Sequence, residues 1–108
     1  DRWLIRGFHP WVHDEHWRMA EVAQAHVGDV LVTHHVPTWK TAARRGRWAK
    51  WAPFSHGDIE YALPRYRVAV HGHSHNRHDY MLRRTRIVAN PCGVSLDGHL
   101  HHSKVIEI

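Results

Sequence analysis

The chain has 108 residues, 43% hydrophobic and 23% charged, which is typical of a single globular segment. Its 15 basic and 10 acidic residues give a net charge of +5, which favours a phosphorylated substrate or a polyanionic partner. No apolar run is long enough to span a membrane, no secretory signal is visible, and the single cysteine excludes an internal disulfide. We therefore expect a cytoplasmic protein without a membrane partner. Because the chain begins with Asp1, we also expect it to be a segment of something longer.

The N-terminal third predicts a short strand followed by a helix. The strand is expected over residues 3–6, where Trp3, Leu4 and Ile5 are apolar, and the segment then breaks at a proline. Asp14 is a suitable N-cap for a helix over residues 14–26, and Gly28 stands where a helix often ends. Trp17 falls on the apolar stripe of this helix, and we interpret it as a core residue rather than a ligand contact.

Two apolar runs predict buried strands that both end in histidines. Residues 29–33 lead directly into His34 and His35, and residues 67–71 lead into a glycine-containing turn. A helix followed by such a strand indicates an α/β unit. Ligands in α/β sheets collect beyond the carboxyl ends of the strands, which is where these histidines fall.

A basic segment over residues 38–56 predicts a long loop in which tryptophans alternate with lysines and arginines. Arg44 and Arg45 are the candidates for contacts with substrate phosphate, because guanidinium groups bind phosphate in a bidentate manner. The alternative is a solvated basic loop whose tryptophans fold back on the core. A short helix is expected to follow, up to residue 63.

The last third predicts more β-structure. Residues 80–82 and 86–89 have the composition of two strands joined by a tight turn near 83–85. Residues 103–108 alternate enough to form a closing strand.

The 14 histidines are the unusual feature of the composition, and they do not form a terminal run. In an extended segment His73 and His75 leave on one face, with Cα atoms about 6–7 Å apart, so they can bind one metal ion or two adjacent ions. His34 joins them if the two strands are neighbours. The alternative is that these are surface or hydrogen-bonded residues. We interpret His35 and His71 as residues that either orient the metal ligands or contact phosphate, with a structural role as the alternative.

Three motifs together resemble the later part of the calcineurin-like metallophosphoesterase family. They are Thr-His-His-Val-Pro over 33–37, Gly-His-Ser-His over 72–75 and Asn-Pro-Cys-Gly over 90–93. The resemblance covers essentially the whole of residues 1–108, read as one segment from the C-terminal part of that domain.

The resemblance implies a fold, a cofactor and an activity. The fold would be α/β, the C-terminal half of a double β-sandwich flanked by helices. The cofactor would be two divalent metal ions of the Mn, Fe, Zn or Ni class, one bound by His34 and His73 and the other by His75. The activity would be hydrolysis of a phosphomonoester or phosphodiester. The chain itself would supply metal ligands, with His35, Arg44 and Arg45 toward the substrate and no assigned catalytic acid or base.

Of the earlier motifs of that family, Gly-Asp-x-x-Asp and Gly-Asn-His-Asp/Glu do not occur in this sequence, and none of its aspartates lies in the context of the family's Asp-x-His motif. Three histidines without a bridging carboxylate leave the repulsion between two cations uncompensated. We therefore expect the remainder of the domain, or a second chain, to complete the site. The alternative functions are a catalytically incomplete basic module that binds nucleic acid or protein, and a protein with one metal ion held by His34, His73 and His75.

Overall fold

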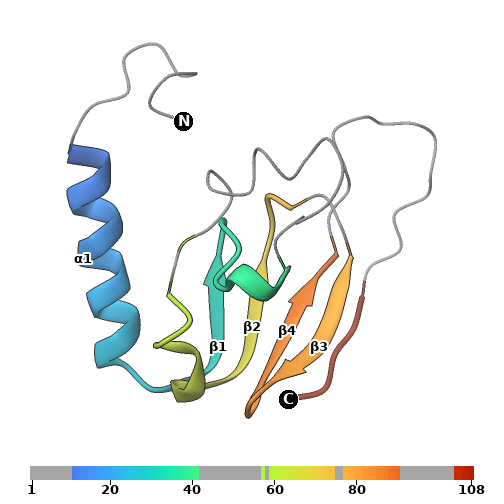
Figure 1. Ribbon diagram of the computed structural model, residues 1–108. Helices are drawn as coiled ribbons and strands as arrows, with labels where there is room; N and C mark the ends of the chain where they lie inside the picture. The colour runs from blue at the N-terminus through green and yellow to red at the C-terminus, as the bar shows by residue number, and fades with distance from the viewer. Residues whose placement is uncertain (1–10, 42–56, 58, 75–76, 91–103) are drawn as a thin grey trace.

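A computed structural model describes residues 11–41, 57, 59–74, 77–90 and 104–108 of the chain (Figure 1). These ranges contain one α-helix, four strands and two short 3-10 turns. The elements are α1 (Trp11–Ala25), β1 (Gly28–Thr33), η1 (Trp39–Thr41), η3 (Leu63–Arg65), β2 (Tyr66–His71), β3 (His78–Leu82) and β4 (Thr85–Ala89).

The four strands form one mixed sheet in the order β1-β2-β4-β3. β1, β2 and β4 run parallel, and β3 pairs antiparallel with β4 as a hairpin. The described part of the chain is therefore an α/β domain, as predicted. Because β1 and β2 are neighbours with Thr33 opposite His71, the segments that follow them leave the sheet side by side. The described residues form a single sheet, so the expected double β-sandwich stays a prediction.

A packed hydrophobic cluster lies on one face of the sheet. Ala69 and Ile87 stand side by side in β2 and β4 and are almost fully buried, together with Leu63 of η3 and Leu82 of β3. Ile87 pairs with Ala69 on one side, and Leu82 points to the same face because residues two apart in a strand share a face. The core therefore fastens β2, β4 and the β3 hairpin together, and β1 lies at the edge of the sheet.

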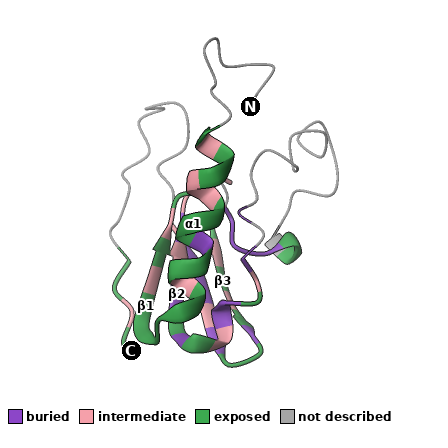
Figure 2. Ribbon diagram, turned by 90° about the vertical axis from the view of Figure 1, so that its left-hand side faces the viewer, coloured by how far each residue is buried: buried purple, intermediate pink, exposed green. Residues whose placement is uncertain are grey.

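Helix α1 lies beside the edge strand β1 (Figure 1) and is exposed along most of its length (Figure 2). The phenol hydroxyl of Tyr66 donates a 2.8 Å hydrogen bond to the carbonyl of Ala23, which ties the helix to the start of β2. Ala20 is the buried residue of the helix. Trp17 is 52% exposed and its ring meets that of His16 edge-on, so its predicted core position is wrong. No described helix combines the length and the apolar composition that crossing a bilayer requires.

All four strands were predicted correctly to within two residues, and three other predictions were wrong. The helix begins at Trp11, so Asp14 lies in its first turn, where a carboxylate still favours the helix dipole. The helix expected up to residue 63 is not found in its described part: residues 60–62 form a turn, and the 3-10 turn η3 follows at Leu63–Arg65, which contains Pro64. Residues 104–108 are not a strand, and Val105 is 89% exposed there. The strand predicted over residues 3–6 lies outside the described residues.

Thr85 joins the start of β4 to the segment before β2. Its side chain is fully buried, and its hydroxyl oxygen lies 2.6 Å from the Leu63 carbonyl and 2.9 Å from the Tyr66 carbonyl. We expect Thr85→Val, which keeps the volume but removes the donor, to lower the free energy of unfolding by about 2 kcal/mol. Urea denaturation measures this. Thr85→Ser keeps the donor and is expected to cost about 1 kcal/mol for the lost methyl group, so equal costs would contradict the role of the hydroxyl.

Candidate metal centre

The ends of β1 and β2 carry histidines that meet in space. His34 follows the last residue of β1, and His73 stands two residues beyond the end of β2. The backbone N–H of Gly72 donates a 3.1 Å hydrogen bond to the carbonyl of His34, which fastens the two strand ends to each other. The expectation that His34 and His73 converge at one edge of the sheet is confirmed.

A strained turn sets the position of the His73 side chain. His73 has φ of 59°, a left-handed conformation that is uncommon for any residue other than glycine. The N–H of Ser74 donates to the carbonyl of Gly72 across 2.7 Å, so the turn closes over three residues with His73 at its centre. Turns of this kind with a positive central φ are rare and strained. Strain of this sort concentrates at functional sites, where the surrounding structure holds it in place.

The segment after β1 is held by hydrogen bonds from both of its sides. The hydroxyl of Thr33 donates to the carbonyl of His35 across 2.7 Å. The N–H of Gly57 donates to the carbonyl of Val36 across 2.9 Å, and Val36 and Pro37 are both buried. The two histidines therefore project from a backbone whose path is fixed, which is what a binding site requires.

His34, His35 and His73 form a cluster that we call the three-histidine cluster. One ring nitrogen of each lies within 4.8 Å of the corresponding nitrogens of the other two. The three pairs of ring centroids are 4.9 to 5.1 Å apart. His34 Nε2 and His73 Nδ1 are 3.1 Å apart and share a hydrogen bond. His34 is exposed and the other two are partly buried, so one side of the cluster faces solvent.

The spacing of the His34 and His73 nitrogens fits a tetrahedral metal ion. Two imidazole nitrogens bound at the usual Zn–N length of about 2.0–2.1 Å lie about 3.3 Å apart, close to the separation of the His34 and His73 nitrogens. The ring that donates the hydrogen bond between them has to move its proton to its other nitrogen before both lone pairs can face an ion. Three protein nitrogens with one open position are the ligand set of catalytic rather than structural zinc sites.

The environment of His35 keeps its imidazole neutral. Burial, and then the neighbouring rings of His73, His34 and His16, lower the pKa of His35 to about 4. Metal ligation needs the neutral ring, so no proton has to leave His35 before it binds an ion at pH 7. The cluster therefore contains a ligand that is ready at neutral pH.

No carboxylate joins the three-histidine cluster within the part of the chain that the structure describes. Asp79, which follows the Gly-His-Ser-His motif, is engaged elsewhere: Arg86 and Lys104 bind its two oxygens at 2.7 to 3.0 Å. These partners hold the pKa of Asp79 well below its usual range. The described ligand set is therefore neutral, and it suits one ion better than two.

The structure brings together part of the predicted site. His34 and His73 lie in the cluster, and His35, expected behind the ligands, offers a nitrogen within 4.8 Å of theirs. In the sequence, the only sign that His35 belongs to the cluster is its position next to His34 in Thr-His-His-Val-Pro. Adjacent residues of a strand point to opposite faces, so the bend after β1 is needed to bring both rings to one side. His75, Arg44 and Arg45 lie outside the described residues.

An apolar pocket of about 360 Å³ opens beside the cluster, between α1 and β1. His34 and His35 form part of its wall. Apolar side chains line most of the rest, among them Ala20, Ala23, Leu31 and Ile59, and polar side chains such as His16, His26 and Tyr66 also contribute. A ligand held at the three-histidine cluster would therefore have an apolar surface next to it.

None of the protein-family models, curated proteins or solved structures compared with this chain matches it.

Proposed function

We propose that this chain provides the metal-binding edge of a metal-dependent phosphoesterase. The observation that carries the proposal is the convergence of His34, His35 and His73 at the carboxyl ends of two neighbouring parallel strands. The motif resemblance to calcineurin-like metallophosphoesterases adds the phosphoester substrate, and the net charge of +5 is consistent with an anionic one.

The three-histidine cluster would hold a divalent ion of the Zn, Mn, Fe or Ni class. Such an ion, when bound, polarises a phosphoryl oxygen and lowers the pKa of a bound water. The chain's own contribution is to fix the three nitrogens, to keep His35 neutral and to leave the exposed side of the cluster open for the substrate. The second ion and its carboxylate bridge belong to the finer proposal, in which His75 and residues outside this chain complete the site.

The pocket between α1 and β1 would receive the organic part of the substrate. It adjoins His34 and His35, and its volume of about 360 Å³ lies within the usual range for small-molecule sites. Its apolar lining favours an aryl or other apolar group over a sugar or a second phosphate. A phosphoester bound at the cluster would thus be positioned by its phosphate and by its apolar group.

A second candidate function is a binding protein for a single metal ion without hydrolysis. The neutral ligand set of the described cluster favours it, because two cations would repel each other there without a carboxylate. The two candidates differ in one measurement, the turnover of a phosphoester by the metal-loaded protein.

The test uses metal-free protein to which Zn²⁺, Mn²⁺ or Ni²⁺ is added singly. We expect about one ion per chain to bind, and hydrolysis of 4-nitrophenyl phosphate or bis(4-nitrophenyl) phosphate to appear only with the ion. His13→Ala, which removes an exposed histidine of α1 outside the cluster, should leave both readings unchanged. Binding without turnover, both in this chain and in a longer protein that completes the site, would support the metal-binding protein, and absence of binding would contradict both candidates.

A further inference from the structure

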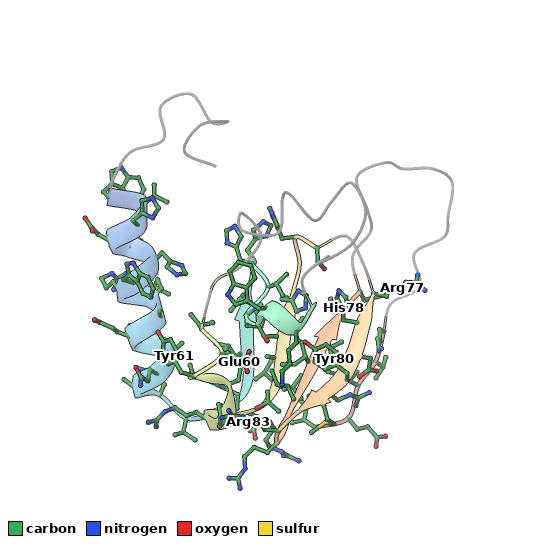
Figure 3. The ribbon with its side chains drawn as sticks, viewed as in Figure 1. Glu60, Tyr61, Arg77, His78, Tyr80 and Arg83 are labelled. Atoms are coloured by element: carbon green, nitrogen blue, oxygen red, sulfur yellow. The ribbon has the colours of Figure 1, made fainter. Side chains whose placement is uncertain are left out.

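A second pair of histidines lies on the same sheet, away from the three-histidine cluster. His71 ends β2 and is only 4% exposed, and His78 begins β3 (Figure 3). Their ring centroids are 5.6 Å apart and their planes are tilted by 30°. The Nε2 atom of each ring is buried, and neither has a hydrogen-bond partner in the structure. Buried polar atoms are almost always satisfied, so two such atoms on neighbouring rings call for a ligand.

The strand register explains why these two rings meet. His78 pairs with Ala89 of β4, and the β2–β4 register, continued by one residue from Val70 and Val88, places His71 on the other side of Ala89. Strands two apart in a sheet are separated by about 9.5 Å. The rings are much closer than that, so both side chains lean over the small methyl group of Ala89.

The hydrogen bond of His71 shows which of its two ring nitrogens is unprotonated. Its Nδ1 lies 3.0 Å from the carbonyl of Gly72, and a carbonyl only accepts, so Nδ1 carries the proton. In the neutral ring Nε2 is then the unprotonated nitrogen, and it is buried on a ring whose centroid lies 5.6 Å from that of His78. An imidazole whose Nδ1–H binds a backbone carbonyl and whose Nε2 is bare has the arrangement of a metal-ligating histidine.

We propose that His71 and His78 form a second, buried metal site that takes one Cu⁺ ion through their two Nε2 atoms. Imidazole nitrogens suit copper and zinc, and no third histidine, cysteine or carboxylate joins the pair within the described residues. Cu⁺ accepts two nitrogen ligands, whereas Zn²⁺ seeks four. The single charge also matters in a buried site, because the Born cost of desolvation grows with the square of the charge and is about a quarter of that for a divalent ion.

The groups around His71 and His78 favour an ion of low charge. Tyr80 lies next to His78 on the same face, with ring centroids 6.5 Å apart, and contributes a neutral phenol (Figure 3). Asp79 is adjacent in sequence, but successive strand residues point to opposite faces, and its carboxylate is bound by Arg86 and Lys104. The carboxylate that a divalent ion would need is therefore directed away from the pair.

The test observes the imidazole nitrogens of the ¹⁵N-labelled full chain by NMR, without oxygen. Before metal is added, His71 should show a protonated Nδ1 and a bare Nε2. On titration with Cu⁺, the Nε2 signals of both His71 and His78 should lose the chemical shift of a bare nitrogen in proportion to the ion bound. Zn²⁺ should instead affect the histidines of the three-histidine cluster. Because this measurement uses the unchanged protein, it does not depend on whether a variant folds.

Two variants sharpen the result. Ala89→Val fills the space between the rings without removing either, and should abolish the response of His71 and His78 to Cu⁺. His13→Ala, outside both groups, should leave it intact. If Cu⁺ leaves both Nε2 signals unchanged, the pair holds a water molecule and the proposal is wrong. If Zn²⁺ moves them as strongly as Cu⁺ does, the assignment to a monovalent ion is wrong.

Discussion

Replacing His73 by asparagine is expected to lower the affinity of the protein for Zn²⁺ at pH 7 by at least about 100-fold. Loss of a group that merely supports a ligand already costs 10- to 100-fold in affinity, and His73 offers a ligand atom itself. Asparagine is chosen because it tolerates the left-handed backbone of this position, where φ is 59°. Competition with a chromophoric chelator measures the affinity, and the metal-dependent hydrolysis of 4-nitrophenyl phosphate should disappear in the same variant.

His73→Gly separates the function of the side chain from its structural cost. Glycine adopts the left-handed region freely, so the strain of about 1–2 kcal/mol at this position is relieved. Part of that gain is offset, because glycine also increases the freedom of the unfolded chain by about 0.4–1 kcal/mol. We therefore expect the metal-free His73→Gly protein to be as stable as the wild type or more stable, while its affinity for Zn²⁺ falls as in His73→Asn.

This combination distinguishes a ligand from a structural residue. A structural role for His73 would appear as a lower free energy of unfolding in both variants, with metal affinity falling only as far as folding does. Unchanged affinity in His73→Asn would remove His73 from the metal site altogether. His13→Ala, an exposed histidine of α1, tests whether the loss of any one imidazole has the same effect.

The strands that carry the site could be predicted from sequence because their signals are local. The apolar runs before His34 and His71, and the turn between β3 and β4, are read from a few adjacent residues. Parallel strands also end at one edge of the sheet, so the meeting of His34 and His73 followed from chain direction alone, once the strands were taken as neighbours.

The features that escaped prediction depend on tertiary contacts. The rings of His71 and His78 meet across Ala89 because β4 lies between β2 and β3, and no local pattern encodes that strand order. Val105 has the composition of a strand residue but stays exposed, because the segment is attached through an ion pair from Lys104 rather than through a ladder. Trp17 has helical spacing, yet its helix lies beside the edge of the sheet and leaves it exposed.

The free energy of unfolding of the metal-free protein is expected to fall as the pH is lowered from about 6.5 to 4. In the folded protein the pKa of His35 is about 4, whereas an unfolded histidine titrates near 6.5. Between these values the unfolded state binds more protons than the folded state, so acid favours unfolding. The contribution of His35 to the free energy of unfolding is fully present above about pH 6.5 and fully lost below pH 4. We expect a loss of about 2 kcal/mol, less than the full shift implies because the ring is partly exposed.

Burial also lowers the pKa of His71 and of His78. These two residues therefore also lower the free energy of unfolding as the pH falls, as His35 does. Urea denaturation at several pH values between 4 and 7 measures the sum, and His35→Gln isolates one part of it. Glutamine does not titrate, so the variant should lose less stability than the wild type across this window while keeping the remainder due to His71 and His78. Equal losses in the two proteins would show that His35 titrates normally in the folded state. The three-histidine cluster would then lack the neutral, preformed ligand on which metal binding at pH 7 relies.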